Sequence, residues 1–163
     1  MDAVSFLCPV CGQTHDELPH ISTDYPEPYF TIPEAELATR VVWTPDTCVI
    51  DDEEHFIRGI VEVPVDDYPA PLGFNAWVSQ SAEAFMAYIQ NFESADLPPT
   101  RGYFATRLAC YSRPTQFLAT TVHFRGGGVR PRIVINATEH PLAIDQRTGI
   151  TLSMACQMLH YFD

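Results

Sequence analysis

The sequence predicts an α+β fold: a mainly antiparallel sheet with helices packed on one face and an N-terminal zinc-knuckle-like loop. Segments with strand character follow one another as hairpins, and helical segments are inserted between and after them. The strands do not alternate regularly with long helices, which disfavours a parallel doubly wound sheet. A chain of 163 residues, 46% of them hydrophobic, has the size of one domain. We therefore expect a single domain over residues 1–163, in which residues 1–30 form the knuckle and a loop-rich entry segment.

The first helix is predicted after this entry segment. Thr31 with Glu34 three residues later resembles a capping box, in which each side chain binds the backbone N–H of the other. Pro33 falls in the first turn, where a missing N–H does little harm. A short helix through about Arg40 follows from this pattern.

Three strands are predicted next. Residues 47–51 are short and apolar, and residues 56–65 alternate with the period of a half-buried strand. The acidic turn at residues 51–54 joins these two strands as a hairpin, and residues 74–79 form a third strand. In the second strand the expected inner face is Ile57, Val61, Val63 and Val65, and the outer face carries Arg58 and Glu62.

The clearest helix begins after Ser81, which has a side chain suited to an N-cap. Its apolar residues recur at helical spacing, and the Leu-Pro-Pro sequence at 97–99 ends the segment. The stripe expected to face the core consists of Ala82, Phe85, Ile89 and Phe92.

The last third of the chain predicts three more strands and two helices. Residues 103–109 and 116–124 are expected to be strands, and a glycine-rich turn leads from the second of these to its partner strand at 132–136. A short helix at 141–147 should stop at Gly149, and Thr151 should cap a final helix. The residues of this helix expected inside are Leu152, Ala155 and Leu159.

Charge is divided unevenly along the chain, whose net charge is −12. Residues 1–100 hold 18 of the 21 acidic residues and only Arg40 and Arg58, whereas residues 101–163 have a net charge of +4. This balance argues against binding to a nucleic-acid backbone, which needs a basic surface. Either the two parts pack together and neutralise each other, or the acidic part is a docking face for a basic protein partner.

The N-terminus has no basic and apolar leader, and no apolar run is long enough to cross a bilayer. We therefore expect a cytoplasmic protein without membrane contact. Its five cysteines would then be reduced, and the odd number agrees with this.

The segment Cys8-Pro9-Val10-Cys11-Gly12 is the strongest chemical signal. Two thiolates at C-x-x-C spacing can chelate one zinc ion, and a glycine after the second lets the backbone turn beneath the metal. Three interpretations compete: structural zinc, which we prefer, a redox dithiol, and a metal-free pair of packed or exposed cysteines. A thioredoxin-like site would need a strand–helix unit that this segment lacks.

A structural zinc site needs four ligands, and the knuckle supplies two. His15 is the natural third, and the fourth is either His20 or the distant Cys48. For Cys48, Cys110 and Cys156 the alternative interpretation is a buried thiol that packs as a small hydrophobe. No nucleophile-elbow, phosphate-loop, dinucleotide-binding or H-E-x-x-H motif is present.

Six segments, taken in chain order, resemble the sequence of a known family. These are Cys8-Pro9-Val10-Cys11-Gly12 with His15 and Leu18-Pro19, Asp46-Thr47-Cys48-Val49-Ile50-Asp51, Phe56-Ile57-Arg58-Gly59, Trp77-Val78-Ser79, His140-Pro141-Leu142, and Gln146-Arg147-Thr148-Gly149-Ile150-Thr151. Together they resemble a family of uncharacterised bacterial cytoplasmic proteins, domain-of-unknown-function family 2199. The resemblance implies no established reaction. It implies a cysteine at Cys48, so that the expected zinc ligands become Cys8, Cys11, His15 and Cys48.

Two functional hypotheses follow. The first is a non-enzymatic binding protein, immunity-like or regulatory, with a structural zinc site and an acidic docking face. The second is a small metal-dependent or arginine-assisted enzyme on a small polar substrate, and it would require several polar side chains to converge in one pocket. Its candidate residues are His15, Arg58, His140 and Arg147.

Overall fold

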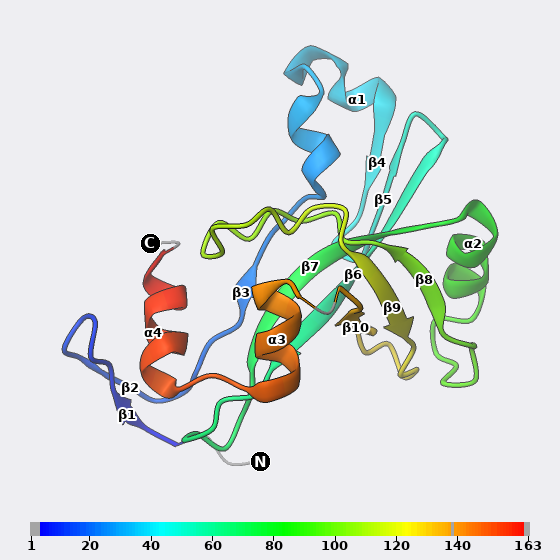
Figure 1. Ribbon diagram of the computed structural model, residues 1–163. Coiled ribbons are helices and arrows are strands. Elements are labelled where there is room, and N and C mark those ends of the chain that lie inside the picture. The colour runs from blue at the N-terminus through cyan, green and yellow to red at the C-terminus, as the bar shows by residue number, and fades with distance from the viewer. Residues whose placement is uncertain (1–3, 138, 162–163) are drawn as a thin grey trace.

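The computed structural model describes residues 4–137 and 139–161, and its largest element is a curled, mixed sheet (Figure 1). The strands are β1 (Phe6–Leu7), β2 (Thr14–His15), β3 (Ile21–Ser22), β4 (Val41–Trp43), β5 (Thr47–Ile50), β6 (Glu54–Val63), β7 (Leu72–Gln80), β8 (Thr100–Tyr103), β9 (Ala119–His123) and β10 (Arg132–Ile135). The helices are η1 (Glu27–Thr31), η2 (Glu34–Glu36), α1 (Leu37–Arg40), α2 (Ala82–Gln90), α3 (Pro141–Thr148) and α4 (Leu152–Tyr161), of which η1 and η2 are 3₁₀ helices.

The order of the large sheet is β3-β7-β6-β10-β9-β8, with β5 attached to β6 and β4 attached to β5. Most neighbours are antiparallel, and the centre is the long β6–β7 hairpin, paired from His55 with Gln80 to Val63 with Leu72. Two pairings are parallel, β3 with β7 and β10 with β6. The predicted α+β class with a mainly antiparallel sheet is thus confirmed.

The sheet curls into a half-barrel because the segment after β8 returns to β7. Phe104 forms a bridge with Val78, and the Ala105 N–H donates to the Trp77 carbonyl at 2.8 Å. Gly102 permits this approach, because a Cβ there would collide with the carbonyl oxygen of Ser79.

The β6–β7 hairpin separates two hydrophobic cores. Ile57, Val61 and Val63 point into the main core, as the alternation predicted. On the other face Phe56 packs with Trp77 in a smaller core, to which β5 contributes Cys48 and Ile50. Because helices α2, α3 and α4 all bury residues in the main core, they cover one face of the sheet.

Helix α2 begins as predicted, with the Ser81 side chain accepting from the Ala84 N–H. Its buried face differs from the predicted stripe, because Phe85 and Tyr88 are buried whereas Ile89 is 46% exposed. The helix packs on the sheet through Phe85 and Tyr88, which are three residues apart and therefore lie on one face. The tyrosine ring packs as an apolar group although it carries a hydroxyl, so a stripe built from apolar residues alone leaves it out.

The ends of α3 and α4 follow the predicted signals. Gly149 ends α3 at φ +87°, a conformation that favours glycine. The Thr151 hydroxyl then accepts from the Met154 N–H at 3.1 Å and starts α4. Ala155 is fully buried as predicted, while Leu152 and Leu159 are half-buried.

Two predicted elements were wrong in form. The helix expected from Thr31 is broken into η1, η2 and α1, because Thr31 donates to the Pro28 carbonyl at 2.7 Å and does not cap the next turn. The strand expected at 103–109 is replaced by β8 at Thr100–Tyr103, after which the chain leaves the ladder. No helix of the described ranges has the length and apolar character needed to cross a membrane.

Candidate metal centre

The knuckle is a tight turn between β1 and β2. The Cys8 N–H donates to the Gln13 carbonyl at 2.8 Å, and the Gly12 N–H donates to the Cys8 carbonyl at 2.9 Å. Gly12 adopts φ +73°, which a side chain would strain. The β1–β2 pairing brings His15 back beside the turn, so that its Nε2 lies 3.2 Å from Cys11 Sγ.

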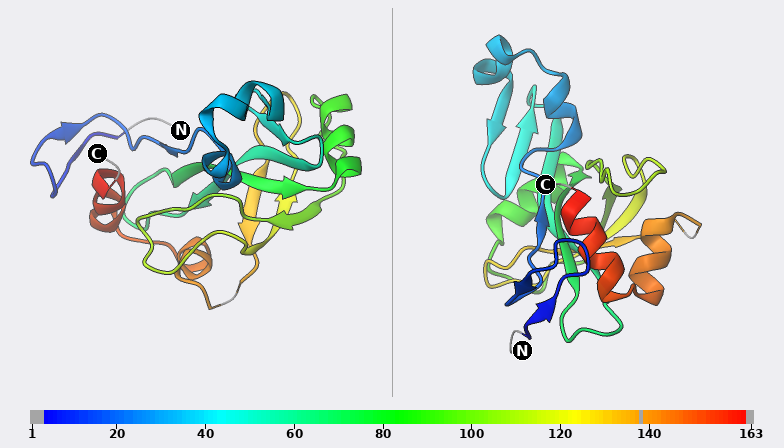
Figure 2. Two further views of the ribbon diagram at one scale, coloured as in Figure 1. Left: turned by 90° about the horizontal axis from the view of Figure 1, so that it is seen from above. Right: turned by 90° about the vertical axis from the view of Figure 1, so that its left-hand side faces the viewer.

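The C-terminal helix forms the other side of this site, since both views of Figure 2 place α4 beside the N-terminal ribbon. Cys156 and His160 stand one turn apart on α4 and therefore face the same way. His160 Nε2 lies 3.3 Å from Cys8 Sγ. Cys156 and His160 line a small cavity of about 170 Å³ together with Cys8 and His15.

Four side chains converge, Cys8, Cys11, His15 and His160, and their ligand atoms all lie within 4.8 Å of one another. A tetrahedral zinc ion with its usual bond lengths would place sulfur and nitrogen about 3.6 Å apart. The two observed sulfur–nitrogen distances, 3.2 and 3.3 Å, are close to this value. A set of two thiolates and two imidazoles suits zinc. The cluster can therefore hold a metal ion such as zinc after small adjustments.

Cys8 is prepared for this role by its surroundings. Burial raises the pKa of its thiol, but hydrogen bonds to the sulfur outweigh this and lower the pKa to about 6. They come first from the backbone N–H groups of Cys11 and Val10, and then from the Cys11 and Cys156 side chains. Burial raises the pKa of the neighbouring Cys156 to about 12, so that Cys156 stays a neutral thiol. Cys8 therefore provides a thiolate at neutral pH, which is the form that binds metals.

Cys48 does not reach the cluster, although the family resemblance implied it as the fourth ligand. It lies in β5, fully buried in the smaller core on the other face of the β6–β7 hairpin. Burial raises the pKa of its thiol to about 11, as expected for a packed cysteine. His20 is also elsewhere, because its ring lies over Gly73 of β7. The structure brings together three predicted ligands and adds His160.

Sequence reasoning missed His160 because it lies 145 positions after His15 in the chain. A local signal existed in the Cys156–His160 pair, whose four-residue spacing places both side chains on one helix face. Taken alone, each residue of the pair is more often structural than a metal ligand.

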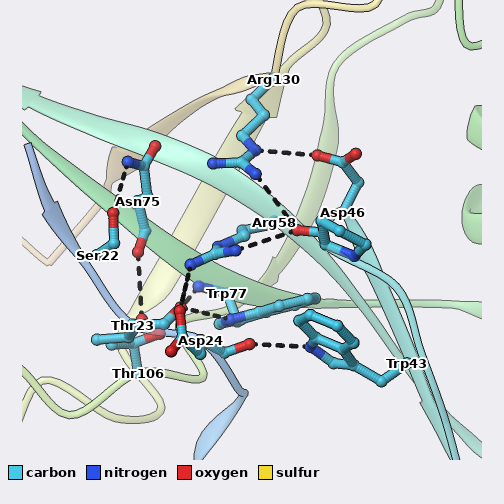
Figure 3. A network of polar contacts seen from close by, with 11 residues as sticks. Ser22, Thr23, Asp24, Trp43, Asp46, Arg58, Asn75, Trp77, Thr106 and Arg130 are labelled. Atoms are coloured by element: carbon cyan, nitrogen blue, oxygen red, sulfur yellow. Dashed lines mark hydrogen bonds and ion pairs between the residues drawn. The ribbon is translucent and has the colours of Figure 1, made fainter.

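A second polar site, around Arg58, fixes the segment of residues 24–54, here named the acidic arm (Figure 3). Arg58 is 6% exposed and donates to the carbonyls of Thr23 at 2.7 Å and Pro45 at 3.2 Å. Its guanidinium stands 5.5 Å from the Trp77 ring centre. Burial, followed by the nearby Arg130, lowers the pKa of Arg58. Arg130 also binds the arm, through Asp46 at 2.9 Å.

His140 and Arg147 lie elsewhere again and have different surroundings. His140 caps α3, with Nδ1 accepting from the Leu142 N–H and Nε2 lying 3.0 Å from the Pro114 carbonyl oxygen. Arg147 is exposed in the last turn of α3. The four candidate residues for an enzyme therefore lie in different local structures. His15 is at the knuckle, Arg58 is in β6, and His140 and Arg147 are at the two ends of α3.

The segment Phe56-Ile57-Arg58-Gly59 has a packing explanation. Phe56 and Ile57 fill the two cores, and Arg58 holds the arm. Gly59 allows β10 to approach β6, because a Cβ there would lie 2.8 Å from the Pro131 carbonyl oxygen.

The segment at 146–151 also has structural roles. The Gln146 side chain accepts from the Ile135 N–H and donates to the Ile133 carbonyl, both at 2.9 Å. Gly149 and Thr151 end α3 and start α4. These segments therefore build the fold, and the knuckle remains the part of the resemblance with metal chemistry.

Comparison with known proteins identifies the family. The sequence model of DUF2199, described as an uncharacterized protein conserved in bacteria, matches residues 7–150, so the chain belongs to this family. Searches of the curated proteins and of the solved structures each gave no match. The matched range includes three members of the cluster, Cys8, Cys11 and His15, and ends before His160.

Proposed function

For this member of the DUF2199 family, we propose a non-enzymatic binding role, immunity-like or regulatory, in which structural zinc joins the two ends of the chain and the acidic arm docks a basic protein. The observation that carries the proposal is the closure of the metal cluster by four protein side chains, Cys8, Cys11, His15 and His160. Catalytic zinc keeps a position open for water or substrate, whereas structural zinc has four protein ligands.

Zinc at this cluster would connect parts of the chain that are far apart in sequence. Cys8, Cys11 and His15 belong to the N-terminal ribbon, which is only two strands of two residues each. A ribbon of this size is marginal by itself in water. His160 lies on α4, which packs in the main core through Ala155 and its neighbours. The ion would thus anchor the ribbon to the folded body.

The charge of the acidic arm supports the docking role. The arm has nine acidic residues and one arginine, Arg40. Figure 1 shows its short helices at one end of the sheet, next to β4 and β5. Four acids of the arm form ion pairs with arginines. No ion pair to a described residue is present for the other five, Glu27, Glu34, Asp52, Glu53 and Glu54.

Neutralisation by the basic part of the chain is therefore incomplete. Arg125 pairs with Glu62 and Arg130 pairs with Asp46, so some acids are compensated as the alternative interpretation expected. The unpaired carboxylates of the arm leave a negative field at its surface. Such a field speeds the association of a positively charged partner and weakens as salt rises.

A pull-down with a matched charge control tests the docking role. The arm variant replaces four acids of the arm by their amides: Glu34, Asp52, Glu53 and Glu54. The control variant makes the same change at four acids outside the arm: Glu17, Glu83, Glu93 and Asp96. At about 50 mM salt the wild type and the control should retain basic proteins that the arm variant loses, and about 500 mM salt should release them. If both variants recovered basic proteins equally, the binding would depend on net charge alone and not on the arm. If the wild type recovered no basic protein at about 50 mM salt, the docking role would be refuted.

The enzyme alternative would need different geometry. A metal-dependent reaction requires an open metal position, and an arginine-assisted one requires a pocket that gathers Arg58 with His140 or Arg147. Arg58 is enclosed by backbone carbonyls, and His140 caps a helix. Metal-dependent turnover of a small polar substrate, lost in His15→Ala but not in Cys48→Ala, would favour this alternative.

A further inference from the structure

A groove of about 300 Å³ opens where β6, β7 and the segment after β8 meet, and it shares no residue with the metal cluster. Its floor is apolar, built from Phe56, Phe104 and Ala105, which are at most 5% exposed. The base of the acidic arm contributes the remaining side, through Pro28 and the acidic turn at the start of β6.

Two aromatic side chains stand on the walls of this groove and remain in solvent. Tyr103 is 61% exposed and Phe117 is 72% exposed. Large exposed aromatic rings around a depression are typical of binding surfaces, because they bury much area when a partner arrives.

Phe117 is also held in a strained backbone conformation. Its φ is +71°, in the left-handed region that bulky residues avoid, and its N–H donates to the Phe104 carbonyl at 2.7 Å. The ring contributes to neither hydrophobic core. Because glycine would take this backbone without strain, the phenylalanine is best explained by what its ring contacts outside the chain.

The rim of the groove is negatively charged. The carboxylates of Glu53 and Glu54 are exposed and have no hydrogen bond or ion pair with another described side chain. Cationic side chains would meet these carboxylates at the rim, while the aromatic walls would also attract a guanidinium or ammonium group.

We infer that this groove, named the aromatic groove, binds a short segment of a basic protein partner in which an apolar side chain is flanked by arginine or lysine. The apolar side chain would cover Phe104, and the cations would face Glu53 and Glu54. A volume of about 300 Å³ is at the lower end of ligand pockets, so it suits one or two side chains. The inference rests on the proposed docking role and supplies its point of contact.

Peptide binding by fluorescence anisotropy tests this inference. The probes are labelled octapeptides of alternating Arg and Leu, of alternating Arg and Ser, and of alternating Ser and Leu. The variants are Phe117→Gly, which removes the ring and relieves the backbone, and Glu53→Gln with Glu54→Gln. The control is Glu83→Gln with Glu93→Gln, which removes the same charge at α2 and just after it.

We expect the wild type to bind the Arg-Leu peptide at least tenfold more tightly than either other peptide. Phe117→Gly should remove most of this preference while the melting temperature stays unchanged or rises, and the Glu53/Glu54 variant should weaken binding more than its control does. Equal binding of the Arg-Leu and Arg-Ser peptides would overturn the groove and leave the acidic arm as the docking face. Binding of neither Arg peptide would also count against the docking role.

Self-association is the competing occupant. Concentration-dependent dimerisation in sedimentation experiments, lost in Phe117→Gly, would show that the groove covers a second copy of the chain and would overturn the inference.

Discussion

Replacing Arg58 by methionine should loosen the acidic arm before the rest of the molecule. The guanidinium donates to two backbone carbonyls, that of Thr23 directly before the arm and that of Pro45 within it. Bonds from a charged donor are each worth about 1.5–3 kcal/mol, so their loss would cost about 3–6 kcal/mol.

Two features reduce this cost. Arg58 Nε is buried without a partner, and removing such a group recovers about 1–3 kcal/mol. Neither carbonyl would be left alone, because Trp77 Nε1 also donates to the Thr23 carbonyl and Arg130 donates to the Pro45 carbonyl. A net loss of about 2–3 kcal/mol is therefore expected, which lowers Tm by about 4–12 °C for a chain of this length.

Urea unfolding, together with hydrogen exchange, measures both the size and the location of the effect. The control is Arg125→Met, which removes a partly exposed ion pair with Glu62 and should cost less than about 1 kcal/mol. Exchange should rise in β4 and β5 and change little in α3 and α4. A stability equal to that of wild type, or faster exchange in α4 with a protected arm, would refute the role given to Arg58.

Three further predictions follow from other parts of the fold. Gln146→Met leaves the Ile135 N–H and the Ile133 carbonyl without their side-chain partner, so urea unfolding should show a loss of about 2–4 kcal/mol, and an unchanged midpoint would contradict the role of Gln146. Burial raises the pKa of Cys48 to about 11, so the stability that its neutral thiol contributes is complete below about pH 9 and is lost as the pH rises towards 11. Between these pH values the Tm of the wild type should fall more steeply with pH than the Tm of Cys48→Ala. Identical profiles of Tm against pH would count against a buried neutral thiol. Removing zinc with a chelator should lower Tm by about 8–16 °C if free zinc had exceeded its dissociation constant about a thousandfold, and a metal-independent Tm would argue against a structural ion.

Local patterns predicted the elements whose signals lie close together in the chain. The β6 alternation, the Ser81 cap and the Gly149 stop all depend on neighbouring residues, and the structure contains each. The helix expected at residues 31–40 was wrong because prolines and a competing Thr31 hydrogen bond divide it into short turns.

The metal centre shows why a site is harder to predict than a strand. The local spacing of Cys8, Cys11 and His15 was sufficient to bring them together. The fourth member depends on where α4 packs, which no local pattern fixes. The family resemblance implied Cys48 as the fourth ligand, but its position in β5 directs its side chain into the smaller core. Likewise the positive φ of Phe117 has no signal in its residue type.

The zinc content of freshly purified, reduced protein tests the central claim most directly, with Cys48→Ala and His160→Ala measured beside the wild type. One zinc per chain is expected in the wild type and in Cys48→Ala, with loss or rapid chelator release in His160→Ala, because the cluster consists of Cys8, Cys11, His15 and His160. No metal in the wild type, or zinc that is lost with Cys48 and kept without His160, would contradict it.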